Sequence, residues 1–177
     1  MRITLLTPPA LLLAAWLGGP RALSLPVWVG GTACVLLGIG LRLWAAGCLR
    51  KQEALACGGP FAYLRNPLYV GTLLIGCGLG VLSGHWESPV LVAALMLTVY
   101  VPTVRHEERE LRALFGPAYD AYCREVPRWV PRLTPLRSEP PGERPRWALV
   151  RRNREHRHLL AQLAILGAFY LVYWLKR

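Results

Sequence analysis

The chain has 177 residues and a mass of 19.7 kDa, a size that would suit one modest domain. Its composition differs from that of a soluble domain, because 54% of the residues are apolar, only 18% are charged and the mean hydropathy is +0.31. These values exclude a disordered or collagen-like chain, and five cysteines without a CxxC pair exclude a disulfide framework and predict no metal site. With a net charge of +11, the chain is predicted to be a basic membrane protein.

Five apolar runs approach the roughly 20 residues that are needed to cross about 30 Å of hydrocarbon. They occupy residues 3–17, 27–49, 68–84, 88–104 and 159–175. The first run is short and contains Pro8 and Pro9, so a cleaved signal peptide is the alternative to a retained helix. Residues 18–21 offer no small-x-small cleavage site, which favours the retained helix. The predicted fold class is an all-α, polytopic membrane helical bundle with about five transmembrane helices.

Two of these runs carry residues that constrain their packing. Arg42 in the second run is costly in lipid, so it should face the bundle or reach the interface. The third and fourth runs are joined only by residues 84–87, which predicts a tight antiparallel hairpin. Gly76, Gly80 and Gly84 recur at helical spacing in the third run, a pattern that indicates close helix packing more than a bound ligand.

The basic residues predict an orientation. If the loop between the second and third runs is cytoplasmic, seventeen Lys and Arg lie on the cytoplasmic side and three on the other, with Arg42 inside a span. By the positive-inside rule, this bias predicts a cytoplasmic N-terminus. A pI near 10.1 would also suit nucleic acid, but the basic residues lie beside the spans and alternate with acids. The bilayer and its anionic headgroups are therefore the predicted partner, and nucleic acid is not.

The first unusual polar segment is residues 59–71, which precede and open the third run. Asn66 followed by Pro67 predicts a helix N-cap with proline at the first helical position. This explanation does not cover Arg65 and Tyr69, which flank the cap. Together they would place a cation, a hydroxyl and the free amides of a helix N-terminus in one corner, an arrangement that suits a carboxylate or a phosphate.

The second unusual segment, residues 105–117, continues the fourth run out of the membrane as a helix. Glu108 and Arg112 have the i,i+4 spacing of an ion pair, and a solvated charged face is favoured for Glu110 and Arg112. Glu107 lies within one turn of the apolar run, where a carboxylate needs a cation or a donor-rich ligand. We therefore expect a functional role for Glu107.

A short amphipathic helix should follow, because Tyr119 and Tyr122 are three residues apart. Their aromatic face could lie on lipid or cover a pocket, and packing against the bundle is the favoured alternative.

Together these segments resemble the isoprenylcysteine carboxyl methyltransferase and phospholipid methyltransferase superfamily of integral membrane enzymes. In that superfamily a segment like RHPxYxG opens one span, and a Glu-Glu pair followed by FGxxYxxYxxxVPR closes the next. The matching residues here are Arg65 to Gly71 (RNPLYVG), Glu107-Glu108, Phe115-Gly116, Tyr119, Tyr122 and Val126-Pro127-Arg128. The resemblance covers about residues 50–132.

The resemblance implies a cytoplasmic catalytic face with an S-adenosylmethionine site that differs from the glycine-rich fold of soluble methyltransferases. The cofactor contacts that it implies are Phe61, Asn66, Pro67, Leu68, Tyr69 and Glu107, with further contacts in the turn from Glu53 to Ala56. One position departs from the family pattern, because Asn66 stands where a His is usual. Asn donates a hydrogen bond but carries no proton at neutral pH, so an acid–base role of that His is not transferred.

The chemistry of methyl transfer suggests Arg65, Arg105 and Glu108 as catalytic residues. A sulfonium is a good leaving group, so the enzyme mainly has to align the reactants in a dry pocket. Arg65 and Arg105 would neutralise an anionic acceptor or the carboxylate of the cofactor. A carboxylate or thiolate acceptor needs no base, whereas a primary amine must lose a proton, for which Glu108 or His106 is nearest. A lipidic or hydrophobic acceptor is expected to enter from the bilayer between helices.

The chain is expected to have three parts. Residues 1–49 would form two N-terminal transmembrane helices, and residues 50–132 the methyltransferase core with the helical hairpin and the cytoplasmic helices. Residues 133–177 would form a Pro- and Arg-rich segment and a C-terminal transmembrane helix. For residues 133–158 a juxtamembrane anchor is favoured over an oligomer contact or a lid.

Two other functions fit part of this pattern. Membrane sterol-type reductases, which bind NADPH, look similar in this region, but their usual bundle is much larger. A non-catalytic membrane scaffold would keep the hairpin without the chemistry, and the presence of Tyr69, Glu107 and Glu108 together speaks against it. The sequence names neither the methyl acceptor nor the oligomeric state.

Overall fold

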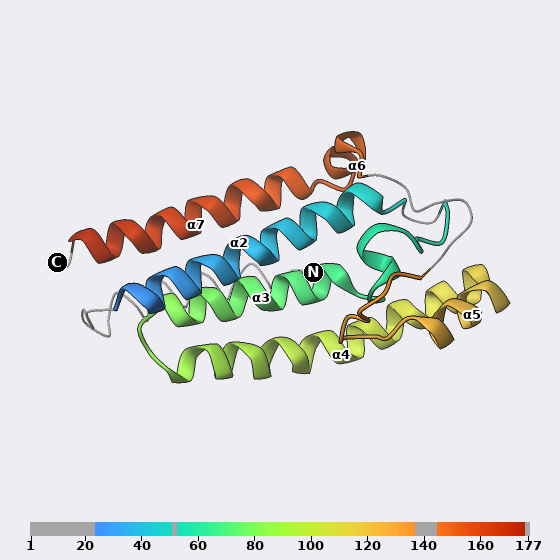
Figure 1. Cartoon of the computed structure of the whole chain (residues 1–177), viewed down its shortest axis with the longest axis horizontal. Coiled ribbons are helices and arrows are strands. Elements are labelled where there is room, and N and C mark those ends of the chain that lie inside the picture. The colour runs from blue at the N-terminus through green and yellow to red at the C-terminus, as the bar shows by residue number, and fades with distance from the viewer. Residues whose placement is uncertain (1–23, 51–52, 137–144, 176–177) are drawn as a thin grey trace. The chain divides into compact units, whose positions relative to one another are not determined.

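The computed structural model describes residues 24–50, 53–136 and 145–175, and these residues form helices and loops without a strand. The described helices are α2 (Leu25–Cys48), the 3-10 helix η2 (Gly59–Ala62), α3 (Pro67–Leu82), α4 (Glu87–Phe115), α5 (Pro117–Glu125), α6 (Trp147–Arg152) and α7 (Glu155–Leu175) (Figure 1). The prediction of an all-α fold is confirmed.

The long helices agree with the predicted membrane spans. Helices α2, α4 and α7 are long and apolar enough to cross a bilayer, and α3 is apolar but has sixteen residues. These four helices correspond to the four apolar runs after residue 26, whereas the run at residues 3–17 lies outside the described residues. The chain is therefore an integral membrane helical bundle, and a total of five spans stays a prediction.

The chain divides into two compact units. One consists of Met1–Ile39, Thr72–Leu97 and Arg157–Arg177, and the other of Gly40–Gly71 and Thr98–His156. Helices α2, α3, α4 and α7 each contribute residues to both units. Both polar segments that stand out in the sequence belong to the second unit, which therefore contains all the candidate site residues.

Glycines in the first unit allow helices to approach closely. A Cβ atom on Gly78 would stand 2.7 Å from the carbonyl oxygen of Gly31, so α3 and α2 meet backbone to backbone. A Cβ on Gly80 would stand 2.8 Å from Cα of Pro89, as expected for a tight hairpin between α3 and α4. Gly84 lies in the connecting turn with φ of 79°, a conformation that favours glycine. The predicted packing role is confirmed for Gly80 and for Gly76, whose Cβ would stand 2.8 Å from the Met96 side chain, whereas Gly84 forms the turn.

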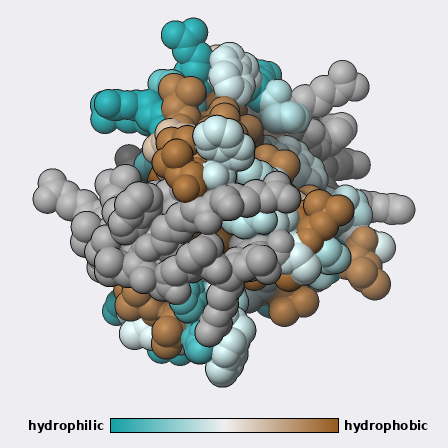
Figure 2. All heavy atoms as spheres, turned by 90° about the vertical axis from the view of Figure 1, so that its left-hand side faces the viewer, coloured by the Kyte–Doolittle hydropathy of each residue, from teal (hydrophilic) through white to brown (hydrophobic). Residues whose placement is uncertain are grey.

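Large apolar side chains of the first unit lie at its surface. Leu25 and Trp86 are each 75% exposed, and Trp174 is 73% exposed. Figure 2 shows apolar side chains (brown) standing out on one face of the molecule. Soluble proteins rarely expose so much apolar surface, so these side chains suit contact with lipid.

In the second unit, the one cation inside a predicted span is buried. Arg42 on α2 forms an ion pair with Glu155 of α7, at 2.5 Å between Nη2 and Oε1. Its Nη1 also donates to the carbonyl of Leu68 in the first turn of α3, at 3.2 Å. Arg42 and Glu155 are only 6% and 4% exposed. The expectation that Arg42 faces the bundle is confirmed, since a buried charge needs such partners.

Candidate active site

A non-helical strap, residues 127–136, brings the two polar segments together. It contains three prolines, which oppose a helix because each lacks an N–H donor and restricts the residue before it. The backbone N–H of Arg65 donates to the carbonyl of Pro127 at 2.9 Å, and the N–H of Arg132 donates to the carbonyl of Tyr63 at 3.0 Å. The strap therefore runs beside the chain that leads into α3.

Helix α5 is fixed against the same region by its aromatic face. Tyr119 and Tyr122 are 1% and 6% exposed, which confirms that they pack against the protein. The Tyr122 hydroxyl donates to the carbonyl of Phe61 at 2.8 Å. Burial raises the pKa of both tyrosines above the ordinary value near 10, because it disfavours the ionised phenolate.

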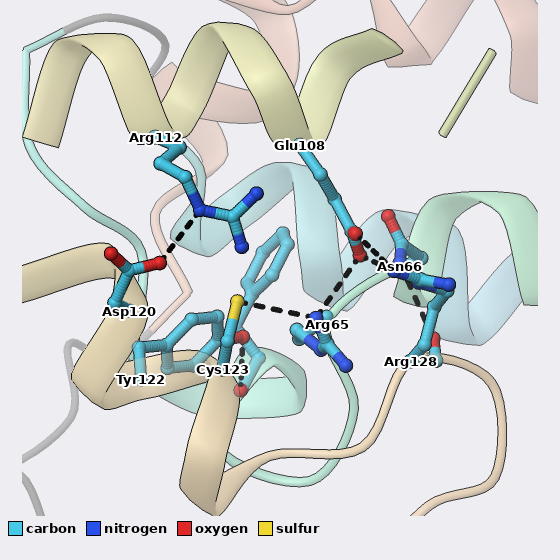
Figure 3. Close-up of polar contacts among 9 residues, drawn as sticks. Arg65, Asn66, Glu108, Arg112, Asp120, Tyr122, Cys123 and Arg128 are labelled. Atoms are coloured by element: carbon cyan, nitrogen blue, oxygen red, sulfur yellow. Dashed lines mark hydrogen bonds and ion pairs between the residues drawn. The ribbon is translucent and has the colours of Figure 1, made fainter. Parts of the chain in front are cut away.

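Glu108 is the centre of the polar contacts (Figure 3). The residue is 4% exposed, and its carboxylate accepts two hydrogen bonds from Arg128, from Nε at 2.9 Å and from Nη2 at 2.5 Å. Nη1 of Arg65 approaches the same carboxylate at 3.3 Å and also donates to Sγ of Cys123 at 3.2 Å. The hydrogen bond to Glu108 raises the pKa of Arg128, so that its guanidinium stays charged. One carboxylate thus joins α4 to the start of α3 and to the strap.

The predicted i,i+4 pair between Glu108 and Arg112 is wrong. Arg112 binds Asp120 of α5 at 2.6 Å instead (Figure 3). Two guanidiniums converge on the buried Glu108 from other segments, and the bidentate geometry of Arg128 is stronger than a local helix pair. The solvated face itself is confirmed, because the side chains of Arg112 and Glu110 are 49% and 67% exposed.

A second polar pair joins α3 to α4. The Tyr69 hydroxyl donates to Oε1 of Glu107 at 2.7 Å, and the Tyr69 ring packs edge-on against Tyr100, with 4.9 Å between ring centroids. Glu107 therefore has the donor that its position requires, although its side chain is exposed. This pair lies one residue along α4 from the buried Glu108, so the two neighbouring carboxylates have different surroundings.

Helix α3 starts at the predicted position. Pro67 is the first residue of the helix and is fully buried, and the Asn66 carbonyl accepts from the N–H of Val70 at 3.2 Å. The Asn66 side-chain amide donates to the carbonyl of Arg128 at 3.3 Å, which ties it to the strap. An amide with a donor group suits this contact, so Asn66 has a structural partner where the family pattern has a His.

Other predicted contact residues lie in or near an apolar cluster. Phe61 is buried against Ala45 and Cys48, and Leu68 packs on the same cluster. In the turn from residue 53, Glu53 is paired with Arg152, and the hydrogen bond from Arg152 lowers the pKa of that carboxyl.

Arg105 is the predicted residue that the structure does not bring to this group. Its side chain is exposed on α4, and its carbonyl accepts a hydrogen bond from Arg109. Residues two positions apart point to different sides of a helix, so Arg105 and Glu107 do not face each other.

Sequence reasoning gave no role to two residues of the group. Arg128 is part of the VPR match, so its motif was the signal for it, whereas nothing in the sequence distinguishes Cys123. The Nε–H of Arg65 is buried and has no hydrogen-bond partner among the described residues. Buried donors are nearly always paired with protein, ordered water or a ligand, so this N–H needs an acceptor beyond the described residues.

Known proteins with related sequences identify the family. A model of the phospholipid methyltransferase family matches residues 26–118. The cobalt-zinc-cadmium resistance protein CzcN of Cupriavidus metallidurans is 34% identical over 110 residues, which are 59% of this chain and 50% of that protein. The protein-S-isoprenylcysteine O-methyltransferase of Schizosaccharomyces pombe is 31% identical over 81 residues, 46% of this chain and 34% of that one.

A third relative, the methanethiol S-methyltransferase of Crocosphaera subtropica, is 34% identical over 77 residues, which are 40% of this chain and 27% of that protein. The chain thus aligns with half or less of the length of these curated relatives. No solved structure matches it. Because the matched segment covers more than half of the sequence, the chain belongs to the phospholipid methyltransferase family, a family of membrane methyltransferases.

Proposed function

We propose that this protein transfers a methyl group from S-adenosylmethionine to a hydrophobic or membrane-embedded acceptor. The family supports methyl transfer in general. The observation that carries the finer proposal is the buried Nε–H of Arg65, which lacks an acceptor among the described residues and belongs to a residue two positions before the first residue of α3. A guanidinium and a helix N-terminus side by side favour a carboxylate ligand.

The residues present suit the parts of this methyl donor. When bound, S-adenosylmethionine supplies a methyl carbon on a sulfonium, which leaves as a neutral thioether. Arg65 would hold a carboxylate, and the exposed Glu107, oriented by the Tyr69 hydroxyl at 2.7 Å, would accept from an ammonium or from ribose hydroxyls. Pro67, Leu68 and Phe61 would form the apolar wall of the pocket and exclude water, and Asn66, whose amide donates to the carbonyl of Arg128, would add a polar group beside it.

The ion pairs of Glu108 favour an acceptor that is already anionic. Both carboxylate oxygens of Glu108 are engaged by guanidiniums, so a role as general base would require these contacts to open. The other nearby base, His106, is exposed and paired with Glu110. An ionised carboxylate or thiolate needs no base. Two relatives, an isoprenylcysteine O-methyltransferase and a methanethiol S-methyltransferase, have names that fit such acceptors.

The orientation and the division of the chain are part of the same proposal. The excess of basic residues on the side of the membrane that holds the loop between α2 and α3 and residues 105–158 supports a cytoplasmic N-terminus and a cytoplasmic active site. The polar donor would then enter from the cytoplasm and the acceptor from the bilayer. Residues 50–132 would contain the catalytic groups, flanked by N-terminal helices and a C-terminal transmembrane helix.

The first test is equilibrium binding of S-adenosylmethionine, S-adenosylhomocysteine and NADPH to the detergent-purified full chain. We expect the first two to bind, and Glu107→Gln to weaken both by roughly 1 to 3 kcal/mol, because a charge-assisted hydrogen bond is lost. Glu110→Gln is the matched control, since it removes an exposed carboxylate from the same helix. Binding of NADPH alone would support the reductase, and no binding by folded protein would support the scaffold.

The second test uses Tyr69→Phe, which removes the hydroxyl that orients Glu107 and keeps the ring against Tyr100. We expect affinity for the methyl donor to fall by about 1 kcal/mol without a change in thermal stability. Tyr63→Phe, in the same segment, is the control. If both variants bind as tightly as the wild type, the donor lies elsewhere.

The acceptor class is tested with three labelled-methyl assays, on a prenylated cysteine carboxylate, a long-chain thiol and phosphatidylethanolamine. We expect methylation of the carboxylate or the thiol. Methylation of the amine alone would contradict the inference drawn from the ion pairs of Glu108.

A further inference from the structure

Helix α6 presents one apolar and one basic face. Leu149 and Val150 are buried, whereas Trp147 is 58% exposed and Arg151 and Arg152 are exposed. Trp147 and Arg151 are four residues apart, so they lie together on the outer side of the helix. An aromatic ring beside guanidinium groups is a combination that suits the boundary between hydrocarbon and lipid headgroups.

This outer face is held in place by polar contacts to the end of α2. The side-chain amide of Asn153 donates to the carbonyls of Ala46 and Leu49, at 2.9 and 3.0 Å. The N–H of Arg146 donates to the carbonyl of Gly47 at 3.0 Å. Because the carbonyls at a helix C-terminus otherwise lack donors, these bonds fix α6 at that point, and its outer face is formed in advance of any ligand.

Among the described residues, the nearby acids of this corner already have basic partners. Glu53 is paired with Arg152, and Glu155 is buried against Arg42. Three other guanidiniums are exposed around α6, and they belong to Arg146, Arg151 and Arg154. Arg154 has φ of 58°, a conformation that is uncommon for residues other than glycine, and it forms the corner between α6 and α7.

The corner also lies at the ends of two helices that can span the membrane, where lipid headgroups are expected. Arg154 directly precedes α7, a helix long enough to cross the bilayer, and α6 is docked on the end of α2, another such helix. Arginines at the end of a spanning helix meet the phosphates of the lipids around it. We propose that Arg146, Trp147, Arg151 and Arg154 bind the phosphate of an anionic phospholipid as a bound lipid of the protein, separate from any methyl acceptor.

The test is native mass spectrometry of the full chain in a neutral detergent, titrated with dioleoylphosphatidylglycerol or dioleoylphosphatidylcholine. We expect the anionic lipid to be retained more tightly, and Arg151→Gln/Arg154→Gln to weaken its binding at least about tenfold. Arg151→Lys/Arg154→Lys should keep most of the affinity, since it keeps the charge. Inorganic phosphate at millimolar concentration should not displace the lipid, and displacement would overturn a lipid site in favour of a free-phosphate site.

The matched control is Arg109→Gln/Arg124→Gln, which removes two exposed arginines elsewhere in the second unit. It should retain the wild-type preference for the anionic lipid. If both double variants lose the same affinity for the anionic lipid, the attraction is diffuse and the proposed site is overturned. Equal retention of the two lipids by the wild type would overturn it as well. Circular dichroism of each variant distinguishes lost binding from lost folding.

Discussion

At the scale of single residues, Glu108 connects three segments of the second unit through one buried carboxylate. Arg128 binds it with two nitrogens and Arg65 with one. Removing the charge of Glu108 would leave two guanidiniums without their carboxylate. One of them belongs to Arg65, whose side chain is only 15% exposed. A buried cation without a counter-charge is strongly destabilising, so the stability of the site depends on this carboxylate.

We therefore predict that Glu108→Gln lowers the free energy of unfolding by about 2 to 3 kcal/mol, less than for a fully buried pair because the Arg128 side chain is 37% exposed. Glu110→Gln, on the exposed side of the same helix, should change it by under about 0.5 kcal/mol. Thermal unfolding in one fixed detergent measures both. Equal shifts in the two variants would contradict the central position of Glu108.

At the scale of helices, contact between α2 and α3 in the first unit depends on glycine. The absent Cβ of Gly78 leaves room for the backbone of Gly31 and for Val35, whose N atom would be 2.9 Å from that Cβ. In lipid, association of helices depends on such close packing, because apolar side chains gain little by leaving the bilayer.

Gly78→Ala should therefore destabilise the protein by about 1 to 3 kcal/mol, because the clash is with backbone that cannot move aside locally. Gly30→Ala is the control, since its Cβ would meet nothing within 4 Å and alanine favours a helix. It should be neutral or slightly stabilising. Thermal unfolding compares the two, and a neutral Gly78→Ala would disprove the tight crossing.

The junction of α6 and α7 with α2 depends on the donor group of Asn153. Its amide satisfies two carbonyls at the C-terminal end of α2, those of Ala46 and Leu49. Asn153→Ala should cost about 1 to 2 kcal/mol of stability through the lost bonds. Asn153→Asp should cost more, because a carboxylate would face carbonyl oxygens at the negative end of the helix dipole. The midpoint of thermal unfolding should be highest with Asn153, lower with Ala and lowest with Asp. A milder effect of Asp than of Ala would contradict this contact.

At the scale of the whole molecule, hydropathy was enough to predict the all-α membrane bundle, because the cost of burying backbone in lipid leaves few alternatives to long apolar helices. The start of α3 at Pro67 followed from local chemistry in the same way. The partners of Glu108 could not be predicted in this way, because the i,i+4 rule considers only one helix. Arg128 lies on a strap that backbone hydrogen bonds align beside Glu108.

Glu107 and Glu108 also show that sequence patterns do not predict contacts between distant segments. Glu107 and Glu108 are about 100° apart around α4, so only one of them can face the interior. Sequence periodicity placed both near the membrane end, but the choice of Glu108 as the buried one depends on where Arg65 and Arg128 lie. The cost of burying Arg42 was predictable, whereas its partner Glu155 stands 113 positions away in the sequence.

That distant pair makes the first and last thirds of the chain depend on each other. Arg42→Leu leaves Glu155 buried without its cation, and Glu155→Leu leaves Arg42 without its carboxylate, so each should cost about 3 to 5 kcal/mol. The double variant should recover most of that loss, because replacing both members of a buried pair by apolar side chains is often neutral. Recovery should stop short of the wild type, since the bond from Arg42 to the Leu68 carbonyl is lost as well. Thermal unfolding of all four proteins in one detergent gives the coupling, and purely additive effects would show that the two side chains do not stabilise each other.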